Sequence, residues 1–206
     1  MWSQLLSIFI AWLLYCVVHS WMASTSFKQV SYQKLGLNDR SYRLAYVLIS
    51  SLLLLPLMYL IWADSTPIVW QHQGWMKLFM DGIALIALIG FFIVARSYNM
   101  SSFMGLTADN SSPSLSISWL HRYVRHPWYF FGLLIIWTRD MSALWLLSCL
   151  AITVYLIVGS RLEENKLISQ YGEAYRYYQQ QVPALLMIPG RYMSDEAMLK
   201  FNALRR

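Results

Sequence analysis

Two charged clusters in the C-terminal half of the chain contain the residue types that could bind and transform a polar ligand. The first runs from Leu120 to Tyr129 and holds two imidazoles, two guanidiniums and three aromatic rings directly before an apolar run. The second runs from Arg161 to Glu164 and carries two carboxylates directly after the next apolar run. If these two runs form a hairpin in a membrane, both clusters return to the same face. We therefore expect one polar site, which the rest of the chain holds in place.

The sequence Arg125-His126-Pro127 has the features of a helix start. Proline fits the first helical turn because its fixed φ and missing N–H cost nothing there, and it pushes the preceding residue toward extended backbone. The unpaired N–H groups and the dipole at such a helix start attract an anion. We therefore expect a carboxylate-bearing ligand to be held at this point.

Glu163 and Glu164 lie across the expected hairpin from this helix start. They could receive the positive or hydroxyl-bearing end of the ligand, and the rings of Trp128, Tyr129 and Tyr123 could stack on a planar base or face a cation. An ordinary interpretation stays open at this point. The basic residues would then be membrane anchors, the glutamates their salt-bridge partners and the aromatic rings part of an interfacial belt.

The composition of the 206-residue chain indicates a membrane protein. Apolar residues make up 58% of the chain and charged residues 13%, which is far from the balance of soluble domains. The net charge of +6 does not indicate a nucleic-acid partner, because the basic residues lie next to apolar runs, as membrane anchoring requires. Cys16 and Cys149 fall inside apolar runs, where a thiol packs as a small hydrophobic group.

Five apolar segments predict an all-α polytopic membrane protein with about five transmembrane helices, the last two forming a C-terminal hairpin. The full-length runs suit the roughly 30 Å hydrocarbon layer. The first is expected to be a retained helix, because no basic segment precedes it as in a signal peptide. The segments are Ser3–Met22, Leu44–Trp62, Leu78–Ala95, Pro127–Thr138 and Ser142–Gly159.

The fourth segment is too short to cross the membrane, since about 12 residues make a helix of roughly 18 Å. If the turn at Arg139-Asp140 reaches the outer interface, His126 and Pro127 must lie about 10 Å below the inner one. Irregular backbone at that depth survives only where it is buried in protein or lines a cavity. The length mismatch therefore predicts a pocket beside His126.

Polar and amphipathic segments complete the expected architecture. Residues 28–43 should form a polar loop, and residues 97–118 a lid or cofactor-lining segment, because long loops are usually functional. Glu163 to Tyr178 predicts an amphipathic helix at the membrane surface. We divide the chain into N-terminal membrane helices (1–96) and a cofactor-binding loop, hairpin and interfacial C-terminal segment (97–206), which together form one integrated membrane domain.

The basic residues also predict an orientation. The segments 23–43, 96–126 and 160–206 hold 4, 3 and 7 of the 16 Lys and Arg residues, whereas the opposite side has only Lys77 and Arg139. Cytoplasmic loops carry the excess of basic residues. We therefore expect a bacterial inner-membrane protein with its N-terminus outside and its C-terminus and polar site in the cytoplasm.

The C-terminal motifs follow one another in a specific order. They are Arg125-His126-Pro127-Trp128-Tyr129, then Glu163-Glu164-Asn165-Lys166-Leu167, then Tyr171-Gly172-Glu173-Ala174-Tyr175-Arg176-Tyr177-Tyr178, and finally Val182-Pro183. Over about 70 residues this pattern resembles the membrane methyltransferases that include isoprenylcysteine carboxyl methyltransferase, phospholipid N-methyltransferases and bacterial methanethiol S-methyltransferases. Phe103-Met104-Gly105-Leu106 also looks like the methanethiol-methylating branch.

The resemblance implies an integral membrane methyltransferase that uses S-adenosylmethionine and acts on a small or lipophilic acceptor, which could be a thiol, a carboxylate or an amine. Methyl transfer from a sulfonium is an in-line displacement that needs alignment and charge placement more than a covalent intermediate. The helix start would hold the methionine carboxylate, and Glu163 the ammonium or the ribose hydroxyls. A thiol acceptor would react as thiolate, so Arg122 or Arg161 could lower its pKa.

The residues that the resemblance implies for the site form two groups. The catalytic residues would be Arg125, His126 and Arg161. The cofactor-binding residues would be His121, His126, Pro127, Trp128, Tyr129, Glu163 and Glu164. The bilayer and the methyl acceptor are the expected partners.

Three positions depart from the family pattern. Phe131 stands where the motif has its glycine, which follows at Gly132, and His121 stands where a tyrosine is common. Gly159 lies where relatives have a basic residue that meets the substrate. The identity of the acceptor is therefore not carried over.

Two other hypotheses remain open. The departures would fit a non-catalytic membrane scaffold or accessory protein that kept the fold. A histidine-ligated metal or haem protein is the third hypothesis, because imidazole and carboxylate ligands suit zinc and iron. Its candidate ligands would be His121, His126, Glu163 and Glu164.

Overall fold

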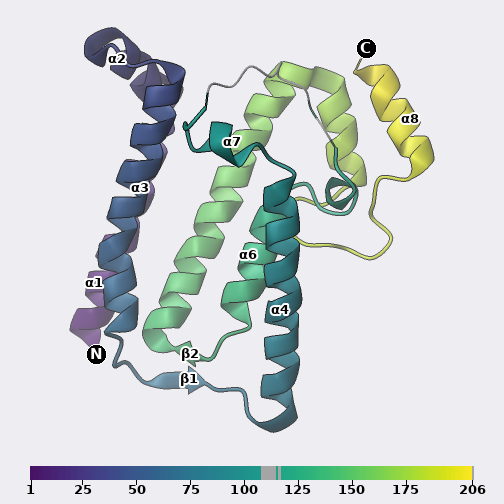
Figure 1. Ribbon diagram of the computed structural model, residues 1–206. Coiled ribbons are helices and arrows are strands. Elements are labelled where there is room, and N and C mark those ends of the chain that lie inside the picture. Colours follow the sequence, from purple (N-terminus) through teal and green to yellow (C-terminus); the bar gives the residue numbers. More distant parts are fainter. Residues whose placement is uncertain (108–114, 116, 206) are drawn as a thin grey trace. The chain divides into compact units, whose positions relative to one another are not determined.

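The computed structural model describes residues 1–107, 115 and 117–205. Helices account for most of this part of the chain, and two very short strands pair with each other (Figure 1). In chain order the elements are α1 (Trp2–Met22), α2 (Thr25–Leu35), α3 (Asp39–Trp62), β1 (Ile68–Trp70), α4 (Gly74–Arg96), α5 (Met100–Phe103), the 3-10 helix η1 (Leu120–Arg122), α6 (Pro127–Trp137), β2 (Met141–Ser142), α7 (Ala143–Gln181) and α8 (Asp195–Leu204).

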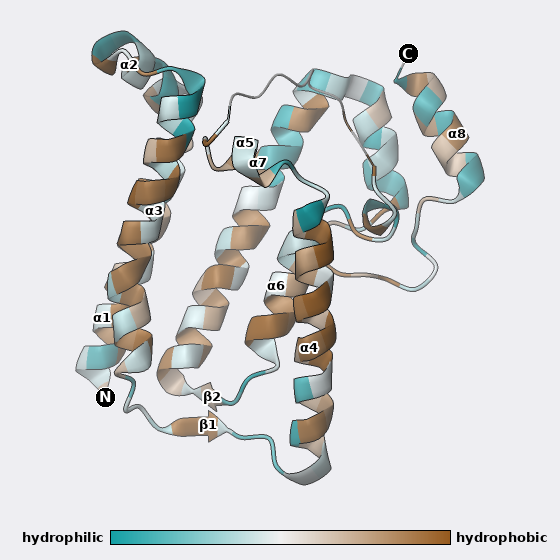
Figure 2. Ribbon diagram, viewed as in Figure 1, coloured by the Kyte–Doolittle hydropathy of each residue, from teal (hydrophilic) through white to brown (hydrophobic). Residues whose placement is uncertain are grey.

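Four helices in the described part of the chain, α1, α3, α4 and α7, are long and apolar enough to cross a membrane, and α6 is a shorter apolar helix. Many of their large apolar side chains are exposed, as expected where lipid replaces water around a helix. Figure 2 shows the hydrophobic residues concentrated along α3, α4 and α6. The predicted fold class, an all-α polytopic membrane protein, is confirmed. The half-length helix is also confirmed, since α6 has 11 residues.

The chain forms two compact units. Unit 1 comprises residues 1–73, 98–112 and 140–152, and unit 2 comprises residues 74–97, 113–139 and 153–206. Helix α7 contributes its first residues to unit 1 and the remainder to unit 2. The division of the chain after residue 96 stays a prediction.

In unit 1, α1 and α3 pack against each other, and the loop after α3 is tied to the start of α7. The strands β1 and β2 pair antiparallel with Ile68 opposite Ser142. The carboxylate of Asp64 accepts hydrogen bonds from the hydroxyl groups of Thr66 (2.7 Å) and Ser142. The buried core of the unit consists of Ile8, Trp12, Leu57 and Leu144. The loops expected on the outer side of the membrane are thus hydrogen-bonded to each other.

In unit 2, α4 and α6 approach closely because a glycine faces an aromatic ring. A Cβ atom placed on Gly90 of α4 would lie 2.5 Å from the ring of Phe131 on α6, so glycine leaves the room that this ring needs. A Cβ atom on Gly132 would meet nothing within 4 Å. The phenylalanine that departs from the family motif is therefore accommodated by Gly90.

A second core in unit 2 joins the end of α7 to α8. It consists of the buried residues Ala174, Tyr175, Tyr178, Val182, Met193, Ala197 and Phe201. The amphipathic pattern after Glu163 predicted a helix, but it did not predict that this helix packs against α8. The tail, which the sequence left without an element, forms α8 with Ser194 as its N-cap.

The expected polar loop at residues 28–43 was wrong, because this segment is largely helical. Helix α2 ends at Leu35 and α3 begins at Asp39. The side chain of Asn38 accepts a hydrogen bond from the N–H of Ser41 (2.9 Å), which is a typical N-cap. Gly36 ends α2 with a left-handed φ of 63°. The few apolar residues of α2 give a weak helical pattern, which composition alone did not separate from a loop.

The expected break between the last membrane helix and the amphipathic helix was also misplaced. Helix α7 is continuous past Gly159 and Glu163, and its one non-helical residue is Gly172, with φ 54° and ψ −126°. In Figure 1 the ribbon of α7 turns back beyond its apolar part. Residues 108–114 and 116, which belong to the predicted lid, lie outside the described residues, and α5 occupies an earlier part of the same segment.

Candidate functional site

The backbone before α6 is fixed by the segment that follows α7. The N–H groups of Arg125 and His126 donate to the carbonyl oxygens of Pro183 (2.9 Å) and Ala184 (3.0 Å). His126 is the N-cap residue of α6, with φ −118° and ψ 70°, and Pro127 occupies the first turn. The predicted helix start is therefore present, and the two proline-containing motifs hold each other in place.

The guanidinium of Arg125 joins this helix start to both parts of α7. Its Nε and Nη2 donate to Oε1 (2.7 Å) and Oε2 (3.0 Å) of Glu164, which is a bidentate ion pair. Its Nη1 donates to the backbone oxygens of Gln179 (3.1 Å) and Val182. The side chains of Arg125 and Glu164 are each 9% exposed. These contacts use most of the five N–H donors of arginine.

Glu164 is the centre of the cluster. Its carboxylate also lies 3.0 Å from Nε2 of His126 and accepts a hydrogen bond from the amide of Gln179 (2.8 Å). Glu164 follows the apolar residues 143–159 of α7, the part of that helix that we expect to cross the membrane. Burial by itself raises the pKa of Glu164, but hydrogen bonds from His126 and Arg125 outweigh burial and lower the pKa to about 2. Glu164 is therefore an anion at neutral pH.

His126 stands between two carboxylates in different surroundings. Its Nδ1 lies 3.6 Å from Oε2 of Glu163, whose side chain is 51% exposed. The buried imidazole also stacks on the ring of Tyr129, with the centroids 5.3 Å apart and the planes 7° from parallel. Arg125 pairs with the buried Glu164, so Glu163 is the carboxylate of the cluster that solvent can reach.

Two predicted cofactor-binding residues pack mainly against the protein. Pro127 is buried. Trp128 is partly buried and packs on α4, with its ring centroid 5.3 Å from that of Phe91. Trp128 thus lies at the same helix start as His126, but its ring packs against Phe91 of α4. Its predicted role toward a cofactor stays a prediction.

His121 and Arg161 differ from the rest of the predicted set. Nδ1 of His121 lies 2.7 Å from the hydroxyl of Ser118. Burial and the neighbouring charge of His126 lower the pKa of His121, so its imidazole is neutral at physiological pH. The side chain of Arg161 is exposed, and it makes no ion pair with any residue that the structure describes. The predicted catalytic role of Arg161 stays a prediction.

Gln179 is a member of the cluster that the sequence did not predict. It belongs to a run of three glutamines that directly follows the predicted amphipathic helix Glu163 to Tyr178. In a straight helix, the 15 residues between Glu164 and Gln179 would separate them by roughly 22 Å. The glycine at position 172, which allows the helix to turn back, was the one available signal.

The cluster offers little geometric support for a metal site. In the described parts of the chain, no group of three or more His, Cys, Asp or Glu side chains is arranged to hold a metal ion. Nε2 of His126 faces Glu164 at hydrogen-bond distance, and a nitrogen that donates an N–H has no lone pair for a metal. The arrangement is instead that of an ion-paired helix start with one accessible carboxylate.

Comparison with known proteins identifies close sequence relatives. The chain is 32% identical over 184 residues to a methanethiol S-methyltransferase of Pseudomonas sp. (strain GM41(2012)), covering 84% of this chain and 69% of the relative. It is 33% identical over 184 residues to the methanethiol S-methyltransferase of Pseudomonas deceptionensis, with the same coverage. With the enzyme of that name from Mycobacterium tuberculosis it shares 31% identity over 193 residues, covering 86% of this chain and 76% of the relative. No family model and no solved structure matches the chain significantly.

Proposed function

The chain belongs to the family of the methanethiol S-methyltransferases, and from this premise we propose that it is a membrane enzyme that transfers a methyl group from S-adenosylmethionine to a small thiol. The family membership rests on 31–33% identity over most of the chain. The location of the site rests on one observation, which is the half-exposed Glu163 beside His126 and the buried Arg125–Glu164 ion pair.

The charges of the residues in the cluster are complementary to those of this cofactor. S-adenosylmethionine carries a sulfonium and an ammonium against one carboxylate and is therefore a net cation. Arg125 compensates Glu164, so the exposed carboxylate of Glu163 is the acidic group that remains to meet a cationic part of the ligand. Opposite charges at short range favour binding. When bound, the cofactor supplies a methyl group carried on its positively charged sulfur.

We assign two kinds of role to the residues of the cluster. Glu163 and His126 would contact the polar groups of the cofactor, and the N-terminal N–H groups of α6 suit its carboxylate. Tyr129 would fix the plane of the imidazole on which it stacks. Arg125 and Glu164 would act as positioning residues, because their hydrogen-bonding groups are engaged within the protein.

The acceptor has to lose a proton before it reacts, since the thiolate is the nucleophilic form of a thiol. The exposed guanidinium of Arg161 would lower the pKa of a bound thiol. The alternative, Arg122, is engaged with the carboxylate of Asp195 (2.6 Å) and the carbonyl oxygen of Met193 (2.8 Å). We therefore favour Arg161, with the site open to the cytoplasmic side of a bacterial inner membrane.

Binding of S-adenosylhomocysteine to the purified 206-residue chain tests the cofactor assignment. Calorimetric titration should show one saturable site, and Glu163→Gln should weaken binding about tenfold, the equivalent of roughly 1.4 kcal/mol. Glu173→Gln is the matched control, because Glu173 is an exposed carboxylate further along α7. Wild-type affinity in Glu163→Gln would remove Glu163 from the site, and no saturable binding by the wild-type chain would refute the cofactor.

Turnover separates an enzyme from a scaffold. With S-adenosylmethionine and methanethiol, the wild-type chain should release dimethyl sulfide, measured by gas chromatography of the headspace. Lipids with a free amine or carboxylate should give no methylated product. Saturable cofactor binding without turnover of any thiol would favour the non-catalytic hypothesis.

A further inference from the structure

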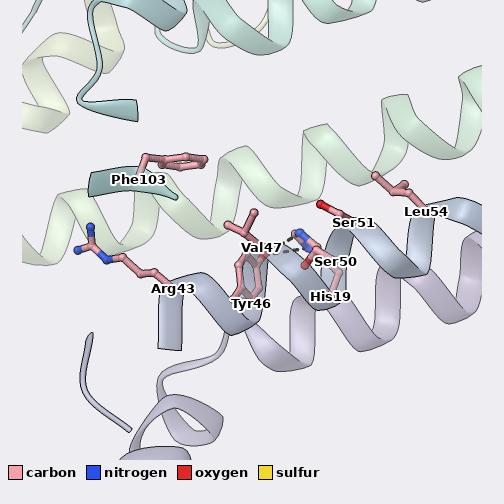
Figure 3. Close-up of a pocket in the computed structure, with 8 residues that line it drawn as sticks. All are labelled: His19, Arg43, Tyr46, Val47, Ser50, Ser51, Leu54 and Phe103. Atoms are coloured by element: carbon pink, nitrogen blue, oxygen red, sulfur yellow. Dashed lines mark hydrogen bonds between the residues drawn. The ribbon is translucent and has the colours of Figure 1, made fainter. Parts of the chain in front are cut away.

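A cavity in unit 1 is lined by residues that we have not assigned to the cofactor site. It encloses about 530 Å³ and is lined by α1, α3 and α5 (Figure 3). That volume lies in the range of pockets that hold ligands of ordinary drug size. It is much larger than methanethiol, which has two heavy atoms. The cavity is therefore larger than the proposed thiol acceptor requires.

The wall on α3 is a row of side chains on one face of that helix. Arg43, Tyr46, Ser50 and Leu54 follow one another at intervals of three or four residues, and Ser51 lies beside them. Such spacing places side chains on the same helical face. In Figure 3 Arg43 and Leu54 lie at opposite ends of this row. The row thus runs from a cation, through hydroxyl groups, to an apolar end.

Polar groups in this row lie on a helix that is long and apolar enough to span a membrane. Ionisable side chains inside membrane helices are rare and usually mark a functional site, and His19 and Arg43 are of this kind. Tyr46 is satisfied by His19 of α1, whose Nε2 lies 2.7 Å from the phenol oxygen. Ser50 differs, because it is only 8% exposed and its hydroxyl has no hydrogen-bond partner among the residues that the structure describes. A buried hydroxyl in this state calls for an acceptor, which a ligand in the cavity would supply.

The segment that follows α4 closes the Arg43 end of the cavity. Gly105 adopts a φ of 75°, and a Cβ atom there would lie 2.5 Å from the backbone nitrogen of Leu44. Nη1 of Arg43 reaches the carbonyl oxygen of Ser102 at 3.3 Å, and Phe103 lines the cavity from α5. Nη1 of Arg43 also donates to the hydroxyl of Ser102 at 3.4 Å, and the five N–H donors of an arginine let it bind an oxyanion alongside other partners.

We propose that this cavity binds one glycerophospholipid of the inner leaflet. Arg43 would pair with the phosphate, the hydroxyl of Ser50 would donate to an ester carbonyl, and Val47 and Leu54 would contact the start of an acyl chain. The order of groups along α3 is the order of groups along such a lipid. Basic pockets between membrane helices on the cytoplasmic side are known to favour phospholipid head groups, and Arg43 lies in the basic segment 23–43.

Three probes test whether both halves of the lipid are needed. The 206-residue chain, stripped of lipid in detergent, is titrated with dioctanoyl phosphatidylglycerol, with dioctanoylglycerol and with inorganic phosphate. Native mass spectrometry counts bound molecules, and thermal unfolding reports stabilisation. We expect one phosphatidylglycerol per chain and a higher unfolding temperature, with little effect of the other two probes. If inorganic phosphate stabilises the chain as much as phosphatidylglycerol does, the cavity is an anion site and the lipid proposal is wrong. If dioctanoylglycerol does so, the cavity is an apolar site without a role for the phosphate, and the proposal is also wrong.

Two variants test whether the lipid binds in this cavity. Arg43→Gln removes the cation, and Ser51→Phe fills space from an exposed position on the same row. Each should weaken phosphatidylglycerol binding about tenfold. The matched controls, Lys34→Gln and Ser7→Phe, change exposed residues outside the cavity and should bind as the wild type does. If the Ser51→Phe variant elutes as a folded, monodisperse protein and still binds phosphatidylglycerol as tightly as the wild type, the proposal is overturned.

Discussion

Glu163 and Glu164 are neighbours in sequence with opposite surroundings, which decides what each can do. Glu164 is 9% exposed and engages Arg125, His126 and Gln179. Its conversion to glutamine would leave the buried guanidinium uncompensated, and breaking such a pair costs on the order of 3 kcal/mol. We expect Glu164→Gln to lower the unfolding temperature of the detergent-solubilised chain clearly. Glu163→Gln should stay within about 0.5 kcal/mol of wild type, and equal losses in the two variants would contradict this division.

The low pKa of Glu164 also predicts how stability depends on pH. Hydrogen bonds from His126 and Arg125 lower the pKa of Glu164 in the folded chain, against burial, from 4.5 to about 2. A carboxyl group with a lowered pKa stabilises the fold above its unfolded pKa, and this contribution is lost as the pH falls toward the folded value. The unfolding temperature should therefore hold from pH 7 to about pH 5 and then fall.

The matched comparison for this pH series is Glu164→Gln, which has no carboxyl group to titrate at that position. Its unfolding temperature should start lower and fall less between pH 5 and pH 3. If the variant and the wild type lose stability in parallel over this interval, the Arg125–Glu164 pair is not the source of the acid sensitivity.

The sequence predicted where the chemistry lies but not the partner of each side chain. A proline-led helix start and two carboxylates one hairpin away were sufficient to place Arg125, His126 and the glutamates in one cluster. Adjacent residues on a helix point about 100° apart, so the choice between Glu163 and Glu164 depends on the rotation of α7. That rotation is fixed by packing between distant segments, which a local pattern does not encode.

At the scale of elements, Gly172 lets α7 turn back, so that this one helix supplies both Glu164 and Gln179 to the cluster. Its φ of 54° and ψ of −126° lie in a region that is essentially restricted to glycine. The turn that it makes allows Gln179 to reach Glu164 at 2.8 Å. A side chain at position 172 would oppose this turn even though the surrounding space is open.

We expect Gly172→Ala to destabilise the chain by about 1–3 kcal/mol and to weaken S-adenosylhomocysteine binding. Gly159→Ala is the control, because Gly159 lies in the helical part of α7 with nothing within 4 Å of a Cβ atom. It should be neutral or slightly stabilising, as alanine favours helix by about 1 kcal/mol over glycine. Thermal unfolding and calorimetric titration of both variants decide this, and indistinguishable results would remove the special role of Gly172.

The contact between α4 and α6 gives a second prediction at this scale. A methyl group on Gly90 would lie 2.5 Å from the ring of Phe131, so Gly90→Ala should destabilise the chain by about 1–3 kcal/mol through overpacking. Gly82→Ala on the same helix has open space and should not. Adding Phe131→Leu to Gly90→Ala should restore part of the lost unfolding temperature. No recovery in the double variant would show that the clash is not with this ring.

Apolar run length was a reliable guide to elements, and polar composition was not. The half-length helix α6 followed from counting residues between Pro127 and the turn at Arg139-Asp140. Helix α2 and the continuity of α7 did not follow, because both depend on N-caps, glycine conformations and packing rather than on a strong apolar face. The pairing of α6 with α4 through Gly90 was equally invisible, since the nearest motif glycine is Gly132.

At the scale of the whole chain, the basic residues and the strand pairing lead to one topology. The loop between α3 and α4 is bound to the turn before α7, because Ile68 pairs with Ser142. Both segments therefore lie on one side of the membrane. The segments 23–43, 96–126 and 160–206 carry most of the Lys and Arg residues, and positive loops stay in the cytoplasm. We therefore propose that the cofactor site faces the cytoplasm.

Single cysteines test this topology in cells. In a background with Cys16→Ala and Cys149→Ala, Ser65→Cys marks the loop before β1 and Glu196→Cys marks α8, and both positions are exposed. A membrane-impermeant maleimide should label Ser65→Cys in intact spheroplasts and Glu196→Cys only in inverted vesicles, because the charged reagent does not cross the bilayer. Reversed labelling would place the Arg125–Glu164 cluster outside the cell, away from its cofactor. In the expected topology, α4, α6 and α7 lie between the two cysteines and make an odd number of membrane crossings. Labelling of both cysteines from one side would require an even number and would contradict this topology.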